Sequence, residues 1–164
     1  MQFKSVFRTP TQLVFAAALS AAALTVPSLA YAGECPADQI AENAMEPGAT
    51  MPKDVTDDVI SSIDLTSKGG AWKGYQLRMR KLVVQPGGIV PWHSHDVRPA
   101  NILITEGAIT EYRSTCKVPI EHKAGDVTAE FGGLSHWWKN NGAATAVLYS
   151  ADILAPAAEA DGSM

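Results

Sequence analysis

The sequence predicts a single all-β domain that closes into a barrel. Short β-type runs recur at even spacing, turn residues separate them, and no long amphipathic helix interrupts the series. In the clearest run Tyr75, Leu77 and Met79 alternate with polar residues, as in a strand with one buried face. Further runs of β-type residues lie at 89–95, 100–105, 108–115, 127–131 and 143–154. Such spacing is typical of sandwiches and barrels.

The boundaries of these runs come from turn residues. Gly, Pro, Asn and Asp cluster at 86–88, 106–107, 124–126, 132–133 and 140–142. The stretch 55–65 fits neither the helical nor the strand period cleanly, so it predicts a first strand only by its apolar content. Before it, residues 37–45 allow one short helical turn in an arm laid on the barrel, or partly mobile.

The first 32 residues have the composition of a cleaved signal peptide. Lys4 and Arg8 precede an apolar run over 13–26, and Ala30 and Ala32 are small residues at the positions that a signal peptidase reads. The run is short for a retained membrane anchor, the rival interpretation. We therefore expect cleavage before Gly33 and a periplasmic or secreted protein. The remainder divides into an N-terminal arm and first strand (33–73), a barrel (74–155) and a flexible tail (156–164).

Charge and cysteine content limit the classes of partner. Removal of the signal takes away two cations and no acids, which leaves 11 cations against 17 acids and a charge of −6. The remaining cations are scattered, so we expect no nucleic-acid binding. We also expect no stable membrane insertion after cleavage. An oxidising compartment would permit a disulfide between Cys35 and Cys116, a pairing that the sequence leaves open.

Three of the four histidines occupy a recognisable spacing. His93 and His95 are two residues apart on an expected strand, so both imidazoles project from one face. Five residues separate Gly87 from His93, and five separate Gly125 from Phe131, after which Gly133, His136 and Asn140 follow. This double pattern resembles the two motifs of the cupin superfamily. The second motif matches at every position except its proline, which here is Phe131.

The resemblance implies a cupin (double-stranded β-helix, or jelly-roll) barrel that brings His136 opposite His93 and His95. These three residues would hold one divalent transition metal, with Fe as the leading candidate and Zn, Ni, Cu or Mn as alternatives. The family's first motif usually contains a glutamate ligand, but Ala100 or Pro99 stands there in this chain. The resemblance is thus to a three-histidine variant, as in cupin dioxygenases that act on thiols and diketones, or to an inactive remnant.

Several other polar residues lie near the two motifs in the sequence. Glu111 and Glu130 are interpreted as solvated surface acids, and His122 as a surface residue. Asn140 is expected to stabilise a turn. Arg98 is a candidate site residue that would hold a substrate carboxylate, the alternative being an ion pair with Asp96.

Two aromatic residues complete the candidates. Tyr112 is a candidate acid or hydrogen-bond donor in the site, although a half-buried strand tyrosine is the commoner case. Trp138 points to the same side as His136 and either walls the pocket or belongs to the core.

Three functions remain open at this stage. The first is a metal-dependent dioxygenase that acts on a small chelating organic substrate. The second is a non-catalytic cupin that senses or carries a small molecule or a metal. The third is an isomerase or decarboxylase, although members with these activities usually keep the carboxylate. A fold alone cannot choose between them. The resemblance also implies a homodimer as one assembly.

Overall fold

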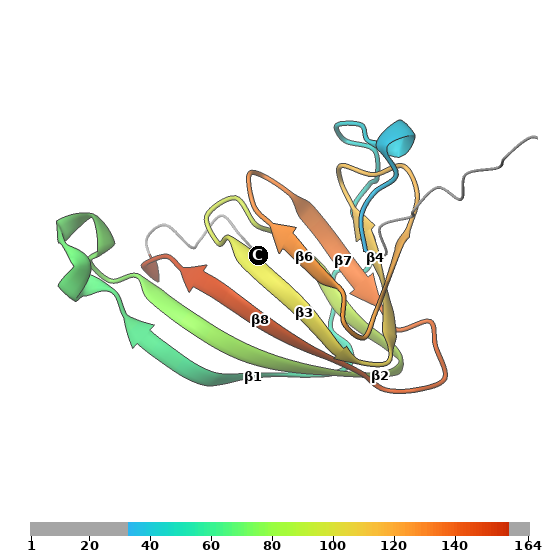
Figure 1. The fold of residues 1–164 in the computed structure, drawn as a ribbon. Coiled ribbons are helices and arrows are strands. Elements are labelled where there is room, and N and C mark those ends of the chain that lie inside the picture. Colours follow the sequence, from blue (N-terminus) through green and yellow to red (C-terminus); the bar gives the residue numbers. More distant parts are fainter. Residues whose placement is uncertain (1–32, 158–164) are drawn as a thin grey trace, which may run out of the picture.

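The computed structural model describes residues 33–157, which form one curled antiparallel sheet of eight strands (Figure 1). The all-β prediction is confirmed. Within these residues no helix is long and apolar enough to span a membrane. The signal peptide at 1–32 and most of the tail lie outside the described residues. The strands are β1 (Lys53–Asp64), β2 (Gln76–Ser94), β3 (Ala100–Glu106), β4 (Ala108–Arg113), β5 (Ile120–Lys123), β6 (Val127–Glu130), β7 (Ser135–Lys139) and β8 (Ala146–Leu154). Three 3₁₀ turns, η1 (Ala37–Gln39), η2 (Thr66–Lys68) and η3 (Gly70–Trp72), complete the elements.

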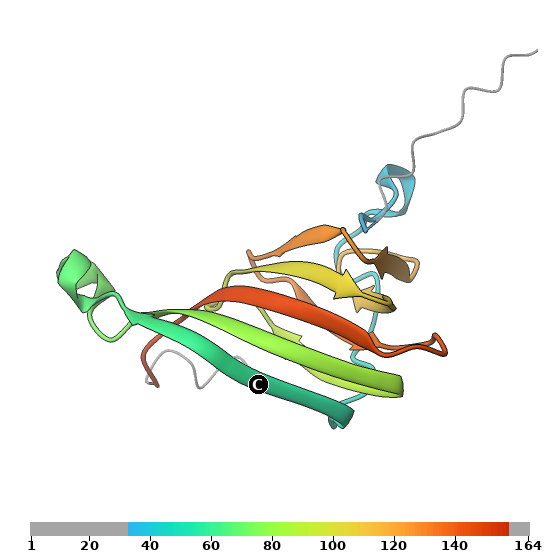
Figure 2. The same cartoon turned by 60° about the horizontal axis from the view of Figure 1, so that its bottom comes forward.

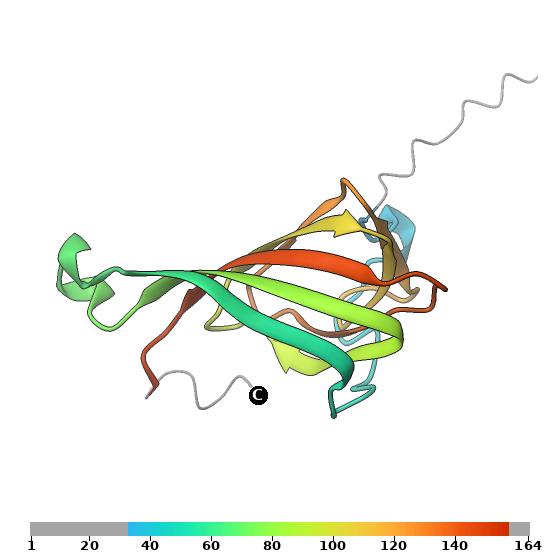
Figure 3. The same ribbon diagram turned by 90° about the horizontal axis from the view of Figure 1, so that it is seen from below.

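Strand β2 connects the two halves of the sheet. Its first half pairs with β1 and β8, and its second half pairs with β7. The sheet order is β5-β4-β7-β2-β8-β3-β6, with β1 added on β2. The long ribbons of β1, β2 and β8 lie side by side (Figure 2), and the sheet curls on itself into a half-barrel (Figure 3).

The sequence predicted a turn at 86–88, where the structure has a bend within one continuous strand. Gly87 adopts a positive φ of 77°, which glycine tolerates without steric cost. Its N–H donates to the carbonyl of Asn140 at 2.9 Å, and the Asn140 N–H donates to the carbonyl of Gly88 at 3.0 Å. The first residue of one motif and the last residue of the other are therefore joined where β2 changes partners.

Two further strands, β5 and β7, were absent from the predicted runs. Both are short, with four and five residues. Strand β4 pairs with β5 on one side and with β7 on the other, so it provides a hydrogen-bonding partner for both. Neighbouring strands, more than local composition, therefore account for these two elements.

The core forms from inward-facing residues at strand period two. On β3 the buried residues Ala100, Ile102 and Ile104 alternate with exposed ones. Burial of an aliphatic side chain of this size contributes about 1.5–3 kcal/mol relative to its exposure. The same cluster contains Leu82, Val84, Ile109, Trp138, Ala146 and Leu148.

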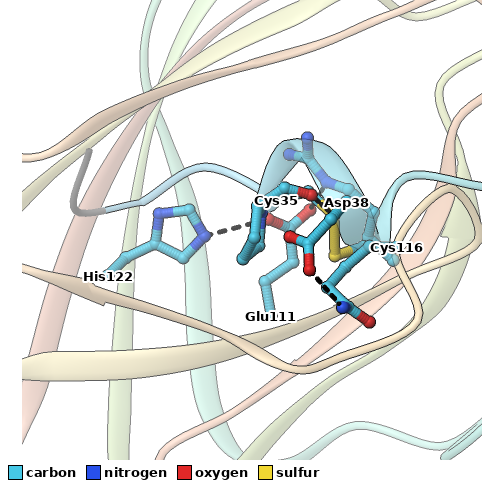
Figure 4. Close-up of a disulfide and its surroundings, with 8 residues drawn as sticks. Cys35, Asp38, Glu111, Cys116 and His122 are labelled. Carbon is cyan, nitrogen blue, oxygen red and sulfur yellow. Dashed lines mark hydrogen bonds and ion pairs between the residues drawn. A yellow bond between two sulfur atoms is a disulfide. The ribbon is translucent and has the colours of Figure 1, made fainter. Parts of the chain in front are cut away.

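The N-terminal arm is fixed to the end of β4. A disulfide joins Cys35 to Cys116, which confirms that pairing (Figure 4). Backbone hydrogen bonds extend the attachment, because the N–H groups of Ala41 and Ala44 donate to the carbonyls of Thr115 and Ser114 at 3.2 and 2.7 Å. The helical turn expected over 37–45 is limited to η1.

Asn140 stabilises its turn as expected. Its side-chain amide donates to the carbonyls of Val84 and Ala144 at 2.9 and 2.8 Å, and its side-chain oxygen accepts from the Gly142 N–H at 2.9 Å. The residue is fully buried, so these bonds satisfy an amide that would otherwise be costly to remove from water.

Candidate metal centre

The three motif histidines meet inside the curled sheet. His93 and His95 lie on β2, and His136 lies on β7 directly opposite His93 in the strand pairing. Between Val90 and His93 the register shifts, so that β2 carries one residue more than β7 over this stretch. Such a bulge exchanges the two faces of a strand. Val90 and His93 can therefore both face the interior, although they are three positions apart and would point to opposite faces of a regular strand.

The reactive nitrogen atoms of the histidines converge. The Nε2 atom of His93 lies 2.9 Å from that of His95 and 3.2 Å from that of His136. The other ring nitrogen, Nδ1, faces the Pro91 carbonyl in His93 and the Arg98 carbonyl in His95, each at 2.8 Å. In His136 it faces Oε1 of Glu111 at 2.6 Å.

These partners assign the tautomers. Carbonyl oxygens and ionised carboxylates only accept hydrogen bonds, so each Nδ1 carries the proton and donates it. The three Nε2 atoms are left with lone pairs that face one another. Lone pairs cannot hydrogen-bond among themselves, and a shared cation is what such an arrangement accommodates.

The electrostatics favour neutral rings. Burial, reinforced by the neighbouring His136, lowers the pKa of His93 to about 2 and that of His95 to about 3. Removal of a charged imidazolium from water is costly, which is the physical cause of both shifts. At neutral pH the imidazoles are therefore in the form that binds metals.

Glu130 is buried, and its interpretation as a solvated surface acid was wrong. It is 1% exposed, on β6, as the direct strand partner of Ala100 on β3. Its Oε2 lies 3.0 Å from Nε2 of His95 and its Oε1 lies 3.5 Å from Nε2 of His136. Paired residues on antiparallel strands point to the same face. Glu130 therefore places a carboxylate beside Ala100, where the first motif lacks its acid.

The arrangement fits a first-row transition metal. Two ligand nitrogens at right angles around such an ion, each about 2.1 Å from it, lie roughly 3.0 Å apart, close to the distances observed here. Oε1 of Glu130 is buried and has no hydrogen-bond partner within residues 33–157. Burial raises the pKa of Glu130 to about 7, a cost that a bound cation would offset. His93, His95 and His136 could thus hold a metal ion, and Glu130, which lies 3.0 Å from His95, could add an oxygen ligand.

A second buried network supports His136 from behind. Glu111 and His122 are both fully buried, so the interpretation of each as a surface residue was also wrong. Besides the His136 contact, Glu111 accepts hydrogen bonds from Nε2 of His122 and Nε of Arg113, each at 2.9 Å. Burial alone would raise the pKa of Glu111, but these bonds hold it well below its usual range. The pair of Glu111 and His122 lies beside the disulfide (Figure 4).

The centre opens onto a cavity of about 610 Å³. Trp138 lines it and is 3% exposed, as expected for a residue that walls the pocket. Arg98 also lines it. Its Nη1 lies 4.0 Å from the carboxylate of Asp152, and within the described residues Arg98 forms no ion pair with Asp96, the alternative expected from the sequence.

Among the candidate site residues, the fully buried His136 does not line the cavity but contacts His93, whereas Tyr112 lies apart from both the cavity and the histidines. Its ring stacks on Trp137 with the centroids 4.2 Å apart, and its hydroxyl accepts a hydrogen bond from Asn141 at 3.1 Å. It is absent from the cavity lining. The structure therefore brings together the three histidines and Arg98, adds Glu130, and leaves Tyr112 outside.

A scan against models of known families found no match, and a search of curated proteins found none either. Several solved structures are similar to the chain. Oxalate oxidase in complex with glycolate has 18% identity over 66% of this chain and 59% of that one, with a TM-score of 0.46. A Cupin 2 conserved barrel domain protein from Salinispora arenicola has 17% identity over 65% and 80%, with a TM-score of 0.46.

The Drosophila melanogaster CENP-C cupin domain has 15% identity over 48% of this chain and 67% of that one, with a TM-score of 0.42. The Salinispora arenicola and Drosophila melanogaster proteins are named as cupin domains, the fold that the two motifs predict. At such identities and TM-scores they carry no information on substrate or activity. The curled sheet that places the motif histidines together is the observation on which the site rests.

Proposed function

We propose that this chain is an exported, metal-binding protein with a cupin fold, and that its centre acts on a small chelating organic substrate as a dioxygenase. The observation that carries the proposal is the convergence of the three Nε2 lone pairs on one another, with the carboxyl group of Glu130 beside His95. A bound ion would supply Lewis acidity and, with Fe, the capacity to activate dioxygen. The remaining contribution comes from the protein's own residues.

Each residue around the centre has a distinct task. His93, His95 and His136 present neutral nitrogens, and Glu130 would supply one negative charge to a bound ion. Glu111 keeps the proton of His136 on Nδ1 and so leaves its Nε2 as an acceptor that faces His93. Apolar side chains, among them Leu82, Leu148 and Trp138, limit the water in contact with the site.

The carboxylate changes the balance between the candidate functions. The comparison with three-histidine dioxygenases assumed a centre without an acid, whereas Glu130 provides one. A buried carboxylate beside a metal site is also a proton acceptor, which favours an isomerase or decarboxylase as the second candidate. The disulfide between Cys35 and Cys116 supports export, because such bonds persist in oxidising compartments.

Metal content tests the first part of the proposal. The exported protein, purified without chelator and also reconstituted with Fe(II), should contain one equivalent of metal by elemental analysis. His93→Ala and Glu130→Gln should each lose most of it, whereas Glu121→Gln, an exposed acid on β5, should retain it. A wild-type protein with no stoichiometric metal after reconstitution, or a His93→Ala variant with full metal content, would contradict the proposal.

Oxygen consumption tests the activity. An iron-loaded sample is incubated with thiols, diketones and phenolic acids in an oxygen-electrode chamber, and uptake should follow with one of these classes. The absence of uptake alongside stoichiometric iron contradicts the dioxygenase and leaves the metal-binding role in place. Isomerase or decarboxylase activity is then measured by product analysis under anaerobic conditions. N-terminal sequencing of the exported protein should begin at Gly33, which tests export separately.

A further inference from the structure

Three arginines line one wall of the cavity beside the candidate metal centre. Arg78 and Arg80 alternate on the inward face of β2, and Arg98 lies in the connection between β2 and β3. Their side chains are 14%, 13% and 18% exposed, so water compensates little of their charge. The acids that contact them are Asp57 on β1 and the fully buried side chain of Asp152 on β8.

Two of these arginines form bidentate ion pairs with these two acids. Arg78 donates from Nε and Nη2 to both carboxylate oxygens of Asp152, at 2.8 and 2.7 Å. Arg80 donates from Nη1 to Asp152 at 3.0 Å, and from Nε and Nη2 to Asp57. Bidentate arginine–carboxylate pairs of this kind hold both partners in a fixed geometry.

Arg98 lacks such a partner. Its Nη1 lies 4.0 Å from an oxygen of Asp152 that already accepts from both other arginines. Its Nε is buried and has no hydrogen-bond partner in the described part of the chain. A buried donor without an acceptor is costly to maintain unless a ligand supplies the acceptor.

The acids near Arg98 are already engaged elsewhere. Asp57 and Asp152 pair with two of the three guanidinium groups, and the carboxyl group of Glu130 lies against the histidines. Arg98 is therefore the guanidinium of the three without a bidentate carboxylate partner. A planar guanidinium with free N–H groups matches the two oxygens of a carboxylate.

Much of the remaining lining of the cavity is apolar. A volume of about 610 Å³ lies in the usual range for small-molecule sites, which is roughly 300–1,000 Å³. The apolar lining residues include Leu82, Val90, Ile102, Trp138, Leu148 and Leu154. A ligand that satisfies both features has one acid group and an apolar body.

We propose that the cavity binds a small organic monocarboxylate with an aromatic or branched aliphatic body, whose carboxylate pairs with Arg98. Where the ligand also reaches the metal, this inference rests on the proposed function. The pairing with Arg98 itself stands independently of any ion.

The test compares matched ligands that differ only in charge. Titration calorimetry on the exported protein, both metal-loaded and EDTA-treated, uses benzoate, 3-phenylpropionate and isovalerate against the primary amide of each. For at least one pair, the acid should bind at least about 10-fold more tightly than its amide, as expected for a largely desolvated charge pair. Arg98→Met should abolish this preference and Arg98→Lys should retain part of it.

Lys123→Met is the matched control, because it removes one exposed cation outside the cavity and should keep the preference. The inference is overturned if no acid binds better than its amide, if the preference survives in a folded Arg98→Met variant, or if phenyl phosphate binds more tightly than every carboxylate. An Arg98-dependent preference in protein that never takes up metal contradicts only the proposed function. Stoichiometric metal without any preference contradicts only this inference.

Discussion

Replacement of Glu111 by glutamine should weaken the metal centre and the fold together. The carboxylate accepts hydrogen bonds from His136, His122 and Arg113, at 2.6, 2.9 and 2.9 Å. A glutamine amide of nearly equal size offers one acceptor oxygen, and its NH₂ group would face a donor. At least one of the three N–H groups therefore loses its acceptor inside the protein.

The magnitude follows from these contacts. A hydrogen bond to a charged group contributes about 1.5–3 kcal/mol, so Glu111→Gln should lower the free energy of unfolding by about 3 kcal/mol. Loss of the acceptor on Nδ1 of His136 also releases the orientation of its ring. Such changes behind a metal ligand typically reduce metal affinity by about 10- to 100-fold.

Denaturant unfolding of the metal-free protein and chelator competition for the metal measure the two effects separately. Glu121→Gln, which alters an exposed glutamate on the adjacent strand β5, should change neither quantity. A Glu111→Gln variant that unfolds like the wild type and keeps its metal affinity would refute the positioning role of Glu111.

Three further changes have expected outcomes. Elemental analysis should show that Glu130→Ala loses metal and that the double variant Glu130→Ala/Ala100→Glu regains part of it, because the two positions are strand partners. Equal metal content in the single and double variants would contradict the shared role. Replacement of Cys35 and Cys116 by serine should cost up to ~4.5 kcal/mol in denaturant unfolding under oxidising conditions, because the disulfide closes a separation of 81 residues. Despite its burial, hydrogen bonds from Arg78 and Arg80 hold the pKa of Asp152 below its ordinary value of 3.8. Its contribution to stability should thus be complete above that value and be lost as the pH falls through the lower folded-state pKa, whereas Asp152→Asn, measured by acid unfolding, should lack this component.

The histidines were predictable because their signal is local. The glycines at fixed distances before His93 and His136 identify the two motifs, and alternation along the strand puts His93 and His95 on one face. What the local pattern could not show is the extra residue of the bulge after Val90, which requires knowledge of the pairing with β7.

The acids escaped prediction for a related reason. On β6 the polar residues Thr128 and Glu130 are buried, whereas the apolar Val127 is 58% exposed. The usual rule, which turns apolar residues inward, gives the wrong face for this strand, because its inner face lines a polar site. Only the register with β3 reveals that Glu130 stands beside Ala100. The inverted alternation was the available signal.

The ladder between β3 and β6 has a consequence for how such proteins are recognised. Two residues that face each other across an antiparallel ladder lie close together in space although they are far apart along the chain. Ala100 and Glu130 are such a pair, so a carboxyl group on β6 stands beside the position where the first motif usually has its acid. A search pattern that demands the acid within the first motif therefore passes over this chain, although the carboxyl group is in place.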